Sequence, residues 1–178
     1  MPACELQELV AADRVRARIS ELAEQMARDF DGTPFVIVRI DEGARRFVEA
    51  LANGLDDRGV APEVQPIRVR RTRGMALLDV QVAAFDPDVF EGRDVLVVDD
   101  IADEGETLRA VLDLLAAVET RSVRTAVLVD KRASRRAPIP LDYVGFEIEG
   151  GWVVGFGMDF EGSYRELDTI SVVVDRRF

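Results

Sequence analysis

The sequence contains no histidine, a single cysteine (Cys4) and a single lysine (Lys131) in 178 residues. Without histidine the chain cannot form a Ser-His-Asp triad, and one cysteine cannot make an intrachain disulfide. The same shortages leave a structural or catalytic zinc site without its usual ligands. Of the 23 basic residues 22 are arginines, so the retention of one lysine favours a position that requires a compact ammonium group.

Long apolar runs and an excess of positive charge are also missing. No apolar run approaches the roughly 20 residues that a membrane-spanning helix needs. The N-terminus MPACELQELVAADR lacks the basic and apolar regions of a secretory signal, so we expect a cytoplasmic protein. The net charge of −11 argues against a nucleic-acid partner, because binding to phosphates requires a basic surface.

The order of apolar patterns predicts one α/β domain over residues 1–178. Residues 11–30 carry apolar side chains at the spacing of an amphipathic helix. The run DVLVVDD at 94–100 predicts a buried strand, and ETLRAVLDLLAAVE at 106–119 predicts the next helix. This alternation of strands and helices indicates βαβ units around a parallel sheet. Further strands are expected within residues 35–40, 60–85, 123–132, 143–148, 152–158 and 170–174, and a further helix within 44–59.

Charged residues follow three of the predicted strands at the point where each strand ends. They are the Asp-Glu-Gly turn at 41–43, the segment DDIADEGET at 99–107, and Lys131. In parallel sheets the ligand binds outside the carboxyl ends of the strands. We therefore expect these three segments to line one crevice.

The acidic segment has a recognisable spacing: two aspartates, two spacer residues, a third aspartate, then x-Gly-x-Thr at the start of a helix. This resembles the signature for 5-phosphoribosyl 1-pyrophosphate (PRPP) in type I phosphoribosyltransferases. The segments VLVDKR, DYVGFEI and WVVGFGMDFEGSYRELD are similar, in order, to the hypoxanthine-guanine branch of that family, so the resemblance covers about residues 11–175. It implies an α/β fold with a central, mostly parallel sheet flanked by helices and a small hood built from the terminal segments.

The resemblance implies a purine salvage enzyme that converts a 6-oxopurine (hypoxanthine, guanine or xanthine) and PRPP into a nucleoside monophosphate and pyrophosphate. It implies Mg²⁺ as the cofactor and a homodimer or homotetramer as the assembly. Asp103 would be catalytic, as the proton acceptor for purine N7 or as the group that stabilises the oxocarbenium-like ribose C1. The residues implied for PRPP are Asp99, Asp100, Glu104, Gly105, Glu106, Thr107, Glu42, Gly43 and Arg165; those for the purine are Lys131, Trp152 and Val153; those for the metal are Asp159, Asp99 and Asp100.

Each implied contact has a chemical reason. Backbone N–H groups at 104–107, with the Thr107 hydroxyl, would bind the 5′-phosphate at a helix N-terminus. The paired aspartates would hold the ribose hydroxyls directly or through magnesium, which prefers oxygen ligands. Lys131 would donate to the exocyclic oxygen of the base, Trp152 would stack on the base, and the backbone of Val153 would read its Watson–Crick edge.

Three features depart from the family. Glu104 and Glu106 flank the loop glycine where threonine and a basic or neutral residue are common, and Glu42 stands where a lysine is common. The covering loop RVRRTRGMALLD lacks the usual Ser-Tyr pair. Two charges about 4 Å apart interact by ~4 kcal/mol at an effective dielectric near 20, so like charge near phosphate matters. The arginines available to compensate are Arg45, Arg46, Arg68, Arg70, Arg71 and Arg73.

The residues by themselves leave simpler interpretations open. The Gly105–Thr107 turn can be a helix start whose acidic residues are stabilised by the helix dipole. Lys131 can be a surface lysine, Trp152 a core or sheet-edge residue, and Tyr164 with Arg165 a surface pair. The acidic substitutions also suit a catalytically weak or inactive relative that binds a nucleotide or a partner in a regulatory role. An RNA-binding regulator is disfavoured by the net charge.

Overall fold

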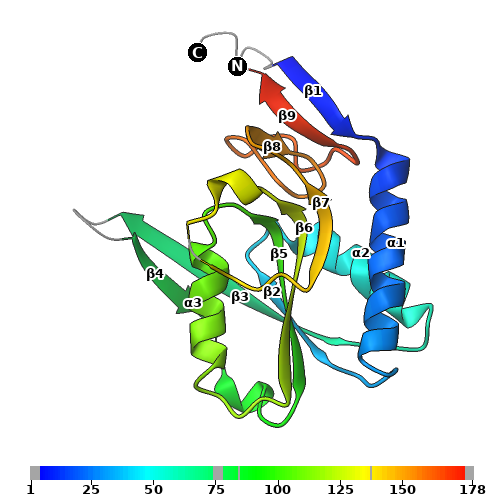
Figure 1. Cartoon of the computed structure of the whole chain (residues 1–178), viewed down its shortest axis with the longest axis vertical. Helices are drawn as coiled ribbons and strands as arrows, with labels where there is room; N and C mark the ends of the chain where they lie inside the picture. The colour runs from blue at the N-terminus through cyan, green and yellow to red at the C-terminus, as the bar shows by residue number, and fades with distance from the viewer. Residues whose placement is uncertain (1–4, 74–77, 84, 137, 175–178) are drawn as a thin grey trace.

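The computed structural model describes residues 5–73, 78–83, 85–136 and 138–174. It contains two sheets, a large one flanked by helices and a small one at one end (Figure 1). The helices are α1 (Ala12–Asp29), α2 (Arg45–Asp56) and α3 (Glu106–Leu115), with short 3-10 turns η1 (Pro87–Val89) and η2 (Arg132–Ser134). The strands are β1 (Glu5–Val10), β2 (Val36–Ile40), β3 (Glu63–Arg73), β4 (Leu78–Ala83), β5 (Asp94–Ala102), β6 (Ser122–Asp130), β7 (Tyr143–Glu147), β8 (Trp152–Val154) and β9 (Ile170–Val174).

The large sheet has the strand order β4-β3-β2-β5-β6-β7. The five strands from β3 to β7 pair in parallel, and β4 joins the edge in antiparallel pairing with β3. Both faces are covered, with α1 and α2 on one side and α3 on the other (Figure 1). Burial on both faces explains why β2, β5 and β6 are continuous apolar runs without polar alternation.

The core divides between the two faces of this sheet according to the period of two along each strand. Leu96 and Val98 pack with α1 and α2, whereas Val95 and Val97 pack with α3. The predicted amphipathic helix is α1, whose apolar stripe is fully buried. The predicted α/β class, with its mostly parallel sheet, is therefore confirmed.

The small sheet is the hood, with the order β1-β9-β8 and antiparallel pairing throughout. Because β1 pairs with β9, the two ends of the described chain lie side by side (Figure 1). A hood from the terminal segments was predicted, but a strand at residues 5–10 was not. The sequence of this strand contains no apolar run that would predict it, and only Val10 is buried. Its conformation is decided by its pairing with β9.

One strand and one loop differ from the sequence prediction. Strand β5 continues to Ala102, because its parallel pairing with β6 extends to the pairs Ile101–Val129 and Ala102–Asp130. The strand therefore includes Ile101 and Ala102 beyond the predicted end at Asp100, and the loop proper begins at Asp103. The predicted covering loop RVRRTRGMALLD spans residues 68–79, but 68–73 belong to β3 and 78–79 to β4. Residues 74–77 between the two strands lie outside the described part, as do the side chains of Arg70, Arg71 and Arg73.

No helix in the described ranges is both long enough and apolar enough to cross a bilayer.

The hydroxyl of Tyr143 links β7 to α1 and has a perturbed acidity. It donates to Asp29 Oδ2 at 2.9 Å and accepts from Arg124 Nη1 at 3.2 Å. Burial, with the hydrogen bond to the Asp29 carboxylate, raises the pKa of Tyr143 to about 12. A pKa that is higher in the folded than in the unfolded state favours folding below the unfolded value near 10, and this contribution is lost as pH rises toward 12.

We therefore expect the free energy of unfolding to fall by about 2 kcal/mol between pH 10 and pH 12 because of this group. Urea unfolding at pH 9, 10, 11 and 12 measures this dependence. In Tyr143→Phe the same series should be flatter by that amount, although the variant is less stable at pH 9. Equal slopes in the two proteins would contradict the assignment.

Candidate active site

A cavity of about 570 Å³ opens at the carboxyl edge of the parallel sheet, under the hood. Its wall brings together the turn after β2, the end of β5 with the start of α3, the residue after β6, and the hood. The lining residues are Asp41, Gly43, residues 99–108, Lys131, Trp152, Val153, Met158, Asp159 and Arg165. The single crevice predicted from the strand order is thus confirmed. Every predicted site residue except Glu42 lies on its wall.

Asp103 and Lys131 form an ion pair inside this cavity. Their strands β5 and β6 are parallel neighbours, so the residues that follow them meet, and Lys131 N–H also donates to the carbonyl of Ala102 at 3.0 Å. Lys131 Nζ lies 2.7 Å from Asp103 Oδ2, and Lys131 is only 9% exposed. The surface interpretation of Lys131 is therefore wrong. The apolar stem of the lysine is buried, and its ammonium group reaches the cavity wall.

The start of α3 forms the part of the wall predicted to bind phosphate. Gly105 is the N-cap residue with φ of +90°, a conformation that favours glycine. Because glycine has no side chain, the N–H groups of the first turn have no side-chain cap, and the residues of this turn line the cavity. Thr107 is buried in this first turn, and Glu106 occupies it where the helix dipole favours an acidic residue.

The carboxylate of Glu104 turns toward the segment that follows β6. It lies 3.1 Å from Arg136 Nη2, and the N–H of Arg136 donates to the carbonyl of Glu104 at 3.0 Å. One of the acidic departures from the family is thus balanced by an arginine partner.

Asp99 and Asp100 lie near the carboxyl end of β5 and line the cavity. The Asp100 N–H donates to Asp99 Oδ1, and the Ile101 N–H donates to Asp100 Oδ1, both at 3.0 Å. Burial raises the pKa of the Asp100 carboxyl, and the hydrogen bonds that it accepts oppose that shift. The Asp100 carboxylate lies close to Gly43, because a Cβ built on Gly43 would be 2.1 Å from Asp100 Oδ2. The glycine of the Asp-Glu-Gly turn is therefore required by close approach.

Glu42 is the predicted site residue that does not line the cavity. Its carboxylate pairs with Arg39 at 3.5 Å and with Arg45 at 3.2 Å, and its side chain is 65% exposed. Asp41, the first residue of the predicted Asp-Glu-Gly turn, was given no role by the resemblance, but it lines the cavity, and its carboxylate accepts from the N–H of Val69 at 2.8 Å.

The hood contributes the remaining wall. Trp152 is 58% exposed, so it is not a core residue; its indole N–H donates to the carbonyl of Asp159 at 3.0 Å, and its ring meets Phe160 edge-on. Arg165 Nη2 lies 2.6 Å from Asp159 Oδ1, and Nη1 donates to the carbonyl of Gly157. Arg165 is therefore part of the site wall and not half of a surface pair with Tyr164.

Known proteins share both this sequence and this fold. The family model described as the phosphoribosyl transferase domain matches residues 5–161. Hypoxanthine phosphoribosyltransferase of Escherichia coli K12 is 30% identical over 173 residues, which cover 95% of this chain and 96% of that protein. A solved structure of hypoxanthine phosphoribosyltransferase from Trypanosoma cruzi, a ternary substrates complex, superposes with a TM-score of 0.89 at 31% identity and covers 96% of each chain.

This chain belongs to the phosphoribosyltransferase family. Both of these relatives carry names of the hypoxanthine-guanine branch, as the sequence resemblance predicted. The bifunctional protein TilS/HprT of Listeria monocytogenes serotype 4b is also 30% identical over 165 residues, and this chain spans about 25% of its length.

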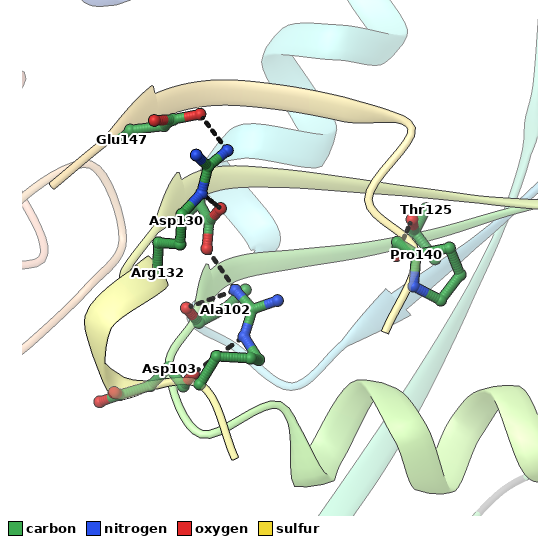
Figure 2. Close-up of polar contacts among 8 residues, drawn as sticks. Ala102, Asp103, Thr125, Asp130, Arg132, Pro140 and Glu147 are labelled. Carbon is green, nitrogen blue, oxygen red and sulfur yellow. Dashed lines mark hydrogen bonds and ion pairs between the residues drawn. The ribbon is translucent and has the colours of Figure 1, made fainter. Parts of the chain in front are cut away.

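Next to the cavity lies an arginine network that no sequence motif predicted, and it binds two residues of the cavity wall. Arg135 Nη2 and Nε donate to the carbonyls of Ala102 and Asp103 at 3.3 and 3.2 Å, and Nη2 pairs with the buried carboxylate of Asp130. Figure 2 shows the Asp130 carboxylate and both carbonyls converging on one guanidinium. Arg132 pairs with Glu147 beside them. The loop that carries Asp103 is therefore tied to the end of β6.

The donor set of this phosphoribosyltransferase suits magnesium, which prefers carboxylate oxygens. Within the described residues, no group of three or more His, Cys, Asp or Glu side chains could hold a metal ion without other ligands. Magnesium commonly binds through one or two carboxylates together with substrate phosphates. Asp99, Asp100 and Asp159 all lie on the cavity wall and carry carboxylate oxygens of this kind.

Proposed function

We propose that this phosphoribosyltransferase transfers the 5-phosphoribosyl group of PRPP to a 6-oxopurine: hypoxanthine, guanine or xanthine. The bond between ribose C1 and pyrophosphate breaks, a bond from C1 to a purine nitrogen forms, and the purine loses one proton. The observation that carries this proposal is the Asp103–Lys131 pair at 2.7 Å, in one cavity with the acidic end of β5 and the start of α3. The names of the relatives support the same reaction.

The purine end of the proposed site has complementary chemistry. An ammonium group has three N–H donors, so Lys131 can donate to Asp103 and still donate to the exocyclic oxygen of the base. Asp103 then accepts the proton from purine N7 or stabilises positive charge at ribose C1. Trp152 stacks on the base with its exposed ring, and the backbone of Val153 pairs with the Watson–Crick edge.

The PRPP end uses backbone and carboxylate groups. The N–H groups of residues 104–107, with the Thr107 hydroxyl, bind the 5′-phosphate, and Asp99 and Asp100 hold the ribose hydroxyls. Gly43 and Arg165 bind the pyrophosphate. Asp159, Asp99 and Asp100 would hold magnesium with the oxygens of PRPP, and the ion would supply neutralisation of the charge on pyrophosphate.

No observation favours the alternative of an inactive regulatory relative. That alternative rested on acidic residues near the phosphates. These residues are Glu42, Glu104 and Glu106. Glu42 lies off the cavity wall, and both Glu42 and Glu104 are paired with arginines. Glu106 is on the wall, in the first turn of α3, where the helix dipole favours an acidic residue.

The substitution Glu42→Gln is expected to change the KM for PRPP by less than about fivefold. An exposed, ion-paired carboxylate contributes at most about 1 kcal/mol, which corresponds to that factor. Steady-state kinetics with varied PRPP measures it. Glu49→Gln is the matched control, because Glu49 also pairs with Arg45, is similarly exposed, and lies on α2 with Arg45. A tenfold lower KM in Glu42→Gln alone would show that this charge does act on pyrophosphate.

The reaction is tested by incubating the protein with PRPP, magnesium and each of the three bases, and measuring nucleotide formed. We expect turnover with at least one base. Absence of turnover with all three would overturn the proposal. Calorimetry with PRPP and with GMP then separates the remaining cases, since binding of GMP without PRPP is the behaviour of a nucleotide sensor.

The proposal also includes a single domain over residues 1–178, a homodimer or homotetramer, and a cytoplasmic location. Size-exclusion chromatography with light scattering tests the assembly, and a monomer at micromolar concentration would contradict it.

A further inference from the structure

We propose that Arg46 is a positioning residue for the hood loop, residues 155–169 between β8 and β9, which carries Asp159 and Arg165. The inference rests on the proposed function for its effect on catalysis, because it concerns the same site. Arg46 lies in the first turn of α2, directly after the turn that contains Gly43, and it does not line the cavity. Its place in the sequence suggested that it balances the charge of the Asp-Glu-Gly turn, but its contacts lie in the hood.

The hood loop has a narrow neck, closed by two backbone hydrogen bonds. The N–H of Phe156 donates to the carbonyl of Leu167 at 2.7 Å, and the N–H of Gly157 donates to the carbonyl of Arg165 at 3.0 Å. Arg46 Nη1 donates to these same two carbonyls, at 2.9 and 3.0 Å. Each carbonyl oxygen thus accepts two hydrogen bonds, one across the neck and one from Arg46.

Two further contacts hold the guanidinium in place. Arg46 Nη2 pairs with Asp168 Oδ1 at 2.5 Å, and its Cζ lies 4.9 Å from the centre of the Phe156 ring. The side chain is 28% exposed, so these contacts are partly shielded from water. A planar guanidinium can make two carbonyl bonds, a carboxylate pair and a ring contact together, which a lysine ammonium cannot do in the same geometry.

The neck that Arg46 binds also contacts the turn after β2. A Cβ on Gly157 would lie 2.2 Å from the carbonyl oxygen of Gly43, so the two backbones touch. From the neck, the Arg165 side chain reaches Asp159 at 2.6 Å. Arg46 therefore determines the positions of Arg165 and Asp159 relative to Gly43. These three residues form the proposed pyrophosphate and magnesium end of the site.

Arg18 provides a matched control. It donates to two carbonyls of β7, from Val144 and Gly145, and pairs with Glu21, so it makes the same types of bond as Arg46. Its side chain is similarly exposed, at 36%, and none of its partners lines the cavity. Arg18→Met therefore removes comparable contacts without touching the hood.

The first readout does not need activity. Trp152 is the one tryptophan of the chain, and its indole N–H bonds to the carbonyl of Asp159 in the hood loop. In Arg46→Met we expect the acrylamide quenching constant of Trp152 fluorescence to rise at least 1.5-fold, with an unchanged far-UV spectrum. Arg18→Met should keep the wild-type constant. Wild-type quenching in Arg46→Met, or an equal rise in Arg18→Met, would overturn the proposal.

The second readout is kinetic. Arg46→Met is expected to lower kcat/KM for PRPP at least tenfold, Arg46→Lys to recover only part of this loss, and Arg18→Met to stay within threefold. A loss in Arg46→Met that Arg46→Lys recovers in full would show that charge alone matters and would overturn the positioning role. If the wild-type protein has no turnover, the proposed function fails, and the Trp152 measurement still decides the role of Arg46.

Discussion

Asp103→Asn is expected to lower kcat by a factor of roughly 10² to 10⁴, the usual contribution of a positioned acid or base. The amide keeps the size of the carboxylate but cannot take the purine proton, and it has no charge to stabilise ribose C1. Because Asp103 does not contact the proposed phosphate sites through its side chain, the KM for PRPP should stay within about threefold. Single-turnover formation of nucleotide at saturating base measures the chemical step.

The control for this substitution is Asp113→Asn. Asp113 lies on α3, is exposed, and pairs with Arg109 at 3.0 Å, so its substitution removes the same charge outside the cavity. It should leave kcat within twofold. A loss of less than tenfold in Asp103→Asn would remove Asp103 from the catalytic role and favour a role in holding Lys131.

Gly43→Ala should raise the KM for PRPP by roughly 10- to 100-fold and lower the free energy of unfolding by about 1–3 kcal/mol, as overpacking does. The new methyl group would lie 2.1 Å from Asp100 Oδ2, so the turn or the carboxylate must move. Both belong to the proposed PRPP site. Kinetics with varied PRPP and urea unfolding measure the two effects separately.

Gly150→Ala is the matched control, because a Cβ at Gly150 meets open space and its φ is not in the left-handed region. That variant should be unchanged in kinetics and equal or slightly higher in stability. A wild-type KM for PRPP in Gly43→Ala would show that the contact between Gly43 and Asp100 has no part in substrate binding.

The elements that the sequence predicted well are those whose signal is local. Strands β2 and β5 are apolar on both faces, and α1 has a complete apolar stripe, so burial alone identifies them. The crevice was also predictable, since residues after parallel strands meet at one edge. Strand β1 was missed because it is mostly exposed and is held by its pairing with β9, a partner about 160 residues away in the chain.

Side-chain partners were much less predictable. Glu42 and Glu104 both suggested repulsion of phosphate, and only the fold shows that Arg39, Arg45 and Arg136 neutralise them. With 22 arginines and 34 acidic residues, sequence spacing does not say which will pair. Asp103 and Lys131 form a pair although they are 28 positions apart in the chain. Arg46 lies about 120 positions from its partners in the hood.

The sequence by itself therefore determined the α/β class, the three charged segments that follow strands and line one crevice, and the family. Apolar periodicity and motif spacing give these, because they are properties of neighbouring residues. The tertiary structure decided which carboxylates face the cavity, which arginines neutralise the others, and how the hood is held over the site. These depend on the direction in which each side chain leaves its strand or helix, and on elements that meet only when the whole sheet has formed.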